Sequence, residues 1–227
     1  MSALRQARAL FLKDVRVELR TREVLSTALL FAIVLVTLFV FSGFSEVALM
    51  REAAPGVMWV CIAFLGTLVF GRTFQREREE RAIAGLLLVP GVLDGLFFAK
   101  LGVNLLLLAV VEALLIPAVA LAFRLDLIPV LGPFLGVVAL ANLGYATLGT
   151  VLSAALASVR LREVILPLVL FPLILPLMVC GVSATSALIG QGAEAPIAPY
   201  IQLLVAFDLL FLALSRWLFS EAVDPRR

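Results

Sequence analysis

Two carboxylic acids lie inside long apolar segments and are the first candidates for chemistry. Glu112 and Asp208 are each flanked by apolar side chains, and a carboxyl group within a membrane is costly enough to mark a functional site by default. They could carry the ion in a carboxyl-dependent secondary transporter, which predicts loss of activity in Asp208→Asn. Alternatively, they form hydrogen bonds between helices, either protonated or near the interface. The sequence leaves both interpretations open.

Most other chemistry is excluded by what the sequence lacks. It contains no histidine, which is the commonest metal ligand, the usual proximal haem ligand and the usual general base. No Gly-x-x-x-x-Gly-Lys-Ser/Thr stretch occurs, so the chain has no P-loop to hold the phosphates of ATP. Cys61 and Cys180 have no metal-binding or redox spacing, and we expect buried, inert thiols. We therefore predict a chain that is not an enzyme and has no catalytic, cofactor-binding or metal-binding residue.

The composition predicts the elements that position these residues. Of the 227 residues, 63% are hydrophobic and 15% are charged, whereas a soluble domain is about half apolar and about a quarter charged. A membrane span needs roughly 20 mostly apolar residues, because its backbone must satisfy its own hydrogen bonds. We predict an all-α integral membrane protein, one domain over residues 1–227, with six transmembrane helices. Their expected ranges are 24–44, 55–71, 96–121, 128–156, 164–189 and 197–219.

The basic residues predict the orientation of these spans. Sixteen of the 18 lysines and arginines fall on one side of the six-span arrangement, and only Arg51 and Arg124 fall on the other. The positive-inside rule then places both termini in the cytoplasm. Most of this charge would face an anionic leaflet, so no nucleic-acid partner is needed to explain it. We expect the bacterial cytoplasmic (inner) membrane as the location.

The N-terminal residues predict a helix that is not a span. Apolar residues recur at steps of three and four within residues 3–20, while five basic residues populate its other faces. We expect an amphipathic helix that lies in the headgroup plane and turns into the first span. A charged tail that only sets the topology is the alternative. The apolar positions are Leu4, Ala7, Phe11, Val15 and Leu19.

A second amphipathic helix is predicted between the second and third spans. Arg76 with Glu80, and Glu77 with Arg81, have the i,i+4 spacing of ion pairs along a helix. An apolar patch follows at residues 83–89, and a proline–glycine pair then ends the helix. A soluble partner that docks there would cover the patch. A loop that folds against its own membrane domain or lipid is the alternative.

The fifth predicted span contains three prolines. Pro167, Pro172 and Pro176 each remove a backbone donor and crowd the preceding turn. We predict a kinked or broken helix. It is either a moving or substrate-facing element or a static kink.

Several of these features together resemble a known family. The charged Glu-Arg-Glu-Glu-Arg run after the second span, the Leu-Leu-Leu-Val-Pro stretch and Lys100 at the start of the third span are similar to exporter-type ABC permeases. Over nearly the whole length the sequence resembles the CcmB family, the permease subunits of the haem exporter system for cytochrome c maturation. The resemblance runs from residues 10–23 through residues 70–77 to the proline-rich fifth span, and the first two stretches are the specific ones.

The resemblance implies a fold and a site. Residues 1–22 would form an elbow helix, and residues 72–95 would contain the coupling helix that sits in a cleft of the ATPase subunit. ATP would bind only in that partner chain. The implied contact residues are Arg78, Glu79, Glu80, Leu87 and Pro90.

The resemblance also implies partners. These are a CcmA-like ATPase, CcmC-like and CcmD-like membrane subunits, a CcmE-like haem chaperone and membrane lipid, together with a second membrane half. Two roles for haem are possible: either haem is the cargo, or ATP is used to release a haem-loaded chaperone. The lack of histidine fits the second role. The alternatives are an ABC permease for a lipid-linked glycan or a drug, the secondary transporter using Glu112 or Asp208, and a structural scaffold for CcmC-like partners.

Overall fold

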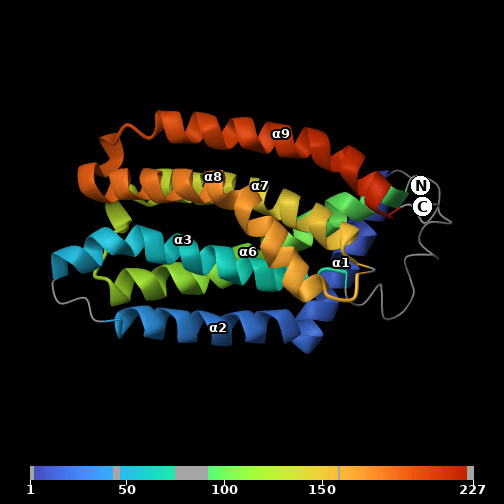
Figure 1. Ribbon diagram of the computed structural model, residues 1–227, viewed down its shortest axis with the longest axis horizontal. Coiled ribbons are helices and arrows are strands. Elements are labelled where there is room, and N and C mark those ends of the chain that lie inside the picture. Colours follow the sequence, from blue (N-terminus) through green and yellow to red (C-terminus); the bar gives the residue numbers. More distant parts are fainter. Residues whose placement is uncertain (1–2, 43–46, 75–91, 158, 224–227) are drawn as a thin grey trace.

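The computed structural model describes residues 3–42, 47–74, 92–157 and 159–223. Within these ranges the chain forms helices and connecting turns, with no strand. Figure 1 shows long helices running side by side, with α1 crossing one end. The elements are α1 Ala3–Thr21, α2 Glu23–Val40, α3 Val47–Arg72, α6 Val92–Ala122, the 3-10 turn η1 Ile128–Val130, α7 Leu131–Ala155, α8 Arg162–Gln191, the 3-10 turn η2 Gly192–Glu194 and α9 Ala198–Val223.

The six predicted spans are confirmed, because the described residues contain six helices long and apolar enough to cross a membrane. The largest difference is at the second span, which begins at Val47 and not near residue 55. Its first turns include Arg51 and Glu52, which are exposed at the end of the bundle, and Pro55, which lies within the helix. Charged residues can occupy the end of a span, so they do not stop the helix.

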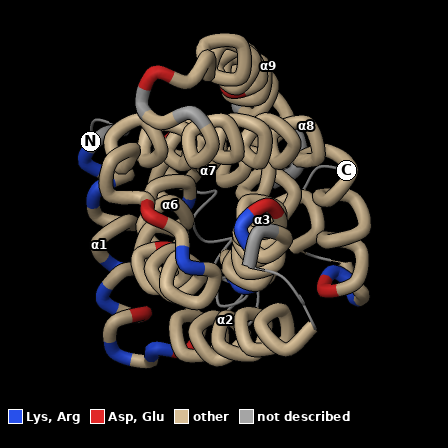
Figure 2. Tube along the Cα trace, turned by 90° about the vertical axis from the view of Figure 1, so that its left-hand side faces the viewer, with Lys and Arg blue, Asp and Glu red and all other residues tan. Residues whose placement is uncertain are grey.

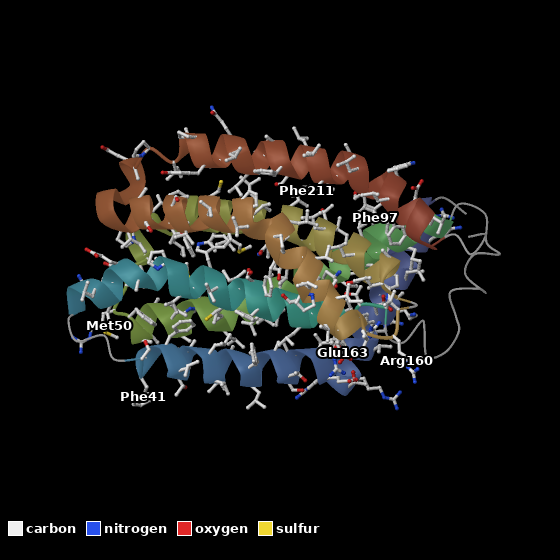
Figure 3. The ribbon with its side chains drawn as sticks, viewed as in Figure 1. Phe41, Met50, Phe97, Arg160, Glu163 and Phe211 are labelled. Carbon is white, nitrogen blue, oxygen red and sulfur yellow. The ribbon has the colours of Figure 1, made fainter. Side chains whose placement is uncertain are left out.

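The two ends of the bundle are distinct. Helix α1, the end of α3 and the C-terminal part of α9 lie at one end, which we call the α1 end. Figure 3 shows Arg160 and Glu163 at this end and Phe41 and Met50 at the opposite end. This arrangement agrees with the predicted sorting of basic residues between the two ends. The assignment of the α1 end to the cytoplasm stays a prediction.

A single residue separates α1 from α2. Arg22 has a φ of 53°, in the left-handed region that residues other than glycine adopt rarely. The Glu18 carboxylate accepts a hydrogen bond from the Leu25 backbone nitrogen at 3.0 Å, which satisfies one of the unpaired donors at the start of α2. An ion pair between Glu23 and Arg72 ties the same turn to the end of α3. The direction of α1 is therefore fixed by side chains of the protein itself.

Helix α7 lies at the centre, in contact with α3, α6, α8 and α9. Its contact with α3 is made by aromatic rings that fit against glycines. The Tyr145 ring fills the space beside Gly66, and the Phe70 ring fills the space beside Gly149, so that a Cβ at either glycine would overlap a ring. The Tyr145 hydroxyl also lies 3.1 Å from the Thr67 hydroxyl. These contacts make α3 and α7 a tightly packed pair.

Helix α3 is joined to α8 in the same way. The Trp59 indole lies against Gly181, and its Nε1 donates a hydrogen bond to the Thr185 hydroxyl at 3.0 Å. By contrast, α2 buries only Ala28 and Ala32. Phe41, just after α2, is 82% exposed and projects away from the bundle (Figure 3). The rigid part of the molecule is therefore built on α3, α7 and α8, with α2 as an outer helix.

Of the two predicted forms of the fifth span, kinked or broken, the broken one is wrong, and Figure 1 shows a bent helix instead. Helix α8 is continuous from Arg162 to Gln191 with all three prolines inside it. A proline removes one backbone hydrogen bond, but the remaining bonds are retained because a lipid environment supplies no other partner for the backbone.

Candidate functional site

A buried lysine joins three helices at the α1 end. Lys100 of α6 is only 4% exposed, and its Nζ lies 2.9 Å from a carboxylate oxygen of Asp14 in α1. The same nitrogen donates a hydrogen bond to the Thr73 backbone oxygen at 3.0 Å and lies 5.2 Å from the centre of the Phe74 ring. A buried ammonium group is stable only with such partners. Lys100 therefore holds α1 and the end of α3 against α6.

An asparagine one turn further along α6 extends this network. Asn104 accepts a hydrogen bond from the Thr73 hydroxyl at 2.9 Å and donates one to the Thr150 hydroxyl of α7 at 2.8 Å. Nearby, the Ser153 hydroxyl of α7 donates to the Phe70 backbone oxygen at 2.7 Å. The end of α3 is thus bonded to α6 and α7 through polar groups that have few other partners in a membrane.

The network includes the residues directly before the segment predicted to bind an ATPase. Thr73 and Phe74 are the last described residues before that segment, and α6 begins just after it at Val92. The predicted contact residues themselves lie outside the described residues, namely Arg78, Glu79, Glu80, Leu87 and Pro90.

The first intramembrane acid has a partner on a neighbouring helix. Glu112 of α6 is 4% exposed and accepts a hydrogen bond from the Asn142 side chain of α7 at 2.6 Å. The other Glu112 oxygen and the Asn142 oxygen are buried without a hydrogen-bond partner among the described residues. The bond joins α6 to α7, as the structural interpretation of Glu112 predicts.

The second intramembrane acid lies on the other side of α7. Asp208 of α9 is 4% exposed and packs against Gly144, where a Cβ would stand 2.6 Å from its Oδ1. Neither of its oxygens has a hydrogen-bond partner among the described residues. Asn142 and Gly144 are two residues apart, which is roughly 200° around a helix. Glu112 and Asp208 therefore contact nearly opposite sides of α7 and do not meet there.

Comparison with known proteins decides the family. A family model described as CcmB protein matches residues 5–225, which is nearly the whole chain. The chain belongs to the CcmB family. Six apolar helices and this membership make it a multi-pass membrane protein, as the sequence predicts.

Curated CcmB relatives match over a shorter stretch. The chain is 29% identical over 91 residues to heme exporter protein B of Escherichia coli (strain K12), and a protein of the same name from Shigella flexneri matches equally. The match covers 40% of this chain and 41% of each relative. The chain thus matches well under two thirds of the length of these relatives.

Sequence reasoning identified some of these polar residues, namely Lys100, Glu112 and Asp208. Lys100 and Asn104 are four residues apart and lie on one side of α6, whereas Glu112 is roughly 120° around the helix from Lys100. The four-residue spacing could have indicated that Lys100 and Asn104 belong to one network. Asp14 and Thr73 were missed, because one lies in a charged helix and the other beside a charged run. Among the described residues no three histidine, cysteine, aspartate or glutamate side chains form a metal-binding group.

The Glu112 pair makes a prediction about stability. We expect Glu112→Gln to retain the stability of the wild type, because its amide can still accept from Asn142 and can also donate to it. Glu112→Leu should lose about 1–3 kcal/mol, because it leaves the Asn142 amide buried without a partner. Unfolding in detergent would measure both variants. Equal stability of the leucine and glutamine variants would show that the pair is not a structural bond.

Proposed function

We propose that this chain is the permease subunit of an ABC transporter that serves haem export in cytochrome c maturation, with ATP hydrolysed in a separate chain. Family membership and relatives named heme exporter protein B support this proposal. The sequence has no P-loop, so the energy of ATP would have to enter through a partner. The chain itself would then be a non-catalytic subunit.

The observation that carries the mechanism is the Lys100 network. ATP binding and hydrolysis in the partner would move the segment at residues 75–91. Thr73 and Phe74, which precede that segment, are held to α6 by Lys100 and Asn104, and Asn104 is bonded in turn to α7. Because α7 packs tightly on α3, the helices would pass the motion to the opposite end of the bundle as nearly rigid bodies.

The lack of histidine bears on whether this chain itself binds haem. A chain without histidine offers haem iron only cysteine, methionine or tyrosine among the usual protein ligands. Cys61, Met58, Cys180 and Tyr145 are buried, while Met50, Met178 and Tyr200 are partly exposed. The lack of histidine therefore carries the argument, and it supports a complex in which ATP releases a haem-loaded CcmE-like chaperone, in preference to one in which this chain binds haem.

The assembly follows from the same proposal. The partners are a CcmA-like ATPase, CcmC-like and CcmD-like membrane subunits and a second membrane half. Both termini and the α1 end would lie on the cytoplasmic side of the inner membrane, where the ATPase is available. An ABC permease for a lipid-linked glycan or drug would have the same architecture, and the co-purified partners separate the two.

The docking segment provides the direct test. We expect Glu79→Lys combined with Leu87→Asp to abolish recovery of the ATPase subunit in a pull-down from mild detergent. The first change reverses a charge of the docking segment, and the second places a charge in its apolar patch. The control pair, Leu49→Asp with Glu52→Lys, changes exposed residues at the opposite end and should retain the ATPase. If the first pair still recovers the ATPase, docking at this segment is wrong.

A secondary transporter is the rival from another class. The unpaired buried oxygens of Asp208 favour it, because a membrane-embedded carboxylate is a usual ion-coupling group. It predicts that Asp208→Asn abolishes transport and that no ATPase is needed. Cytochrome c maturation that persists in Asp208→Asn but fails with an ATPase-dead partner would remove this rival.

A further inference from the structure

The two sides of α1 have different chemistry. Its inner side contacts the protein: Phe11 ring atoms come within 3.2 Å of the position of a Cβ at Gly102, Asp14 pairs with Lys100, and Glu18 caps α2. The inner side is therefore already occupied. It includes Phe11, one of the apolar positions of the predicted amphipathic helix, which packs on α6.

The outer side of α1 carries arginine and leucine together. At 100° per residue, its exposed positions between Arg5 and Arg20 fall within about 140° of the helix circumference. Leu19 is 68% exposed and Leu12 is 38% exposed. Leu19 was expected to share a side with Phe11, but the structure places it among the basic residues. The outer face consists of Arg5, Arg8, Ala9, Leu12, Lys13, Arg16, Leu19 and Arg20.

The charge of this outer face is entirely positive. Asp14 and Glu18 are the only acidic residues of α1, and both are used in the inner contacts with Lys100 and Leu25. Figure 2 shows the basic positions along α1 at the margin of the apolar bundle. Nothing acidic on α1 therefore competes with an anion that approaches the arginines.

This combination fits a membrane surface of anionic phospholipid. Guanidinium groups bind phosphate with paired hydrogen bonds, while the two leucines can enter the boundary between headgroups and acyl chains. Arg22 alone separates α1 from the first span, so the helix lies near the level of the headgroups. An acidic protein surface would satisfy the arginines but gives no reason for leucines on the same side.

We propose that the outer face of α1 binds anionic phospholipid headgroups and that the inner contacts hold this face in place. This binding is independent of the proposed transport function, because it requires only the folded chain. Through Asp14 and Lys100, a bound lipid would also stabilise the contact between α1 and α6.

Native mass spectrometry of the detergent-purified full chain tests the proposal. The chain is titrated with phosphatidylglycerol and, in parallel, with phosphatidylcholine. We expect Arg5→Gln with Arg16→Gln to weaken phosphatidylglycerol binding about tenfold and to leave phosphatidylcholine unchanged. The control, Arg51→Gln with Arg124→Gln, also replaces two arginines but at the opposite end of the bundle. It should bind phosphatidylglycerol as the wild type does.

A second variant tests the apolar part of the face. Leu12→Ser with Leu19→Ser retains every charge, and we expect weaker binding of both lipids, with the preference for phosphatidylglycerol retained. Equal binding of phosphatidylglycerol by the wild type and the arginine variant would overturn the proposal. Loss of a co-purified soluble protein in the arginine variant, with lipid binding intact, would likewise overturn it and assign the face to a protein partner.

Discussion

Asp14→Asn is expected to lower the free energy of unfolding by about 3 kcal/mol, since breaking a buried pair leaves an uncompensated charge. The Lys100 side chain is only 5% exposed and its nitrogen lies 2.9 Å from Asp14. Unfolding of the purified chain in detergent would measure the loss. The double variant Asp14→Asn with Lys100→Met should be less destabilised than Asp14→Asn alone, because it leaves no buried charge.

A matched control separates this effect from the general loss of an acid. Asp126 is exposed at the opposite end of the bundle, and Asp126→Asn should change stability by no more than about 0.5 kcal/mol. If Asp14→Asn behaves like Asp126→Asn, the ion pair contributes nothing and the network cannot transmit force. Asp14→Asn should also reduce cytochrome c maturation while recovery of the ATPase is retained, because the network is proposed to couple the ATPase to the helices.

Gly66→Ala is expected to lose about 2 kcal/mol, because the new methyl group would overlap the Tyr145 ring in a closely packed contact. The ring cannot move away easily, since its hydroxyl is bonded to the Ala63 backbone oxygen and lies beside the Thr67 hydroxyl. The measurement is again unfolding in detergent. We also expect weaker packing between α3 and α7.

The same helix contains the control. Gly56 of α3 has no atom within 4 Å of a Cβ position, so Gly56→Ala should be neutral or stabilise by up to about 1 kcal/mol through helix propensity. A loss of similar size in both variants would show that the space beside Gly66 does not determine the packing of α3 and α7.

The six spans could be predicted from the sequence, whereas their exact ends could not. Each span is a local run of apolar residues, so its presence and approximate position can be read from the sequence. The second span shows where this fails: Arg51 and Glu52 suggested a boundary, but the helix continues through them to Val47. Hydropathy measures preference for lipid, whereas helix ends depend on backbone bonding and local contacts.

The site was only partly predictable, because its chemistry lies in pairings between helices. The sequence identified Glu112 and Asp208 as buried acids. It could not show that Asn142 bonds to Glu112 or that Gly144 makes room for Asp208. Likewise, the charge of Asp14 was visible, but its burial against Lys100 depends on how α1 packs on α6.

The contacts of α3 also determine when the protein can finish folding during synthesis. Trp59 is bonded to Thr185, 126 residues later in the chain. At about 5–20 residues per second, a ribosome needs roughly 6–25 s to make that stretch. During this interval α3 is already made but lacks its partner α8, so the Trp59 indole is unbonded. A nascent chain that stalls before α8 would therefore contain an incompletely packed α3, the part of the molecule most open to wrong pairing with other helices in the membrane.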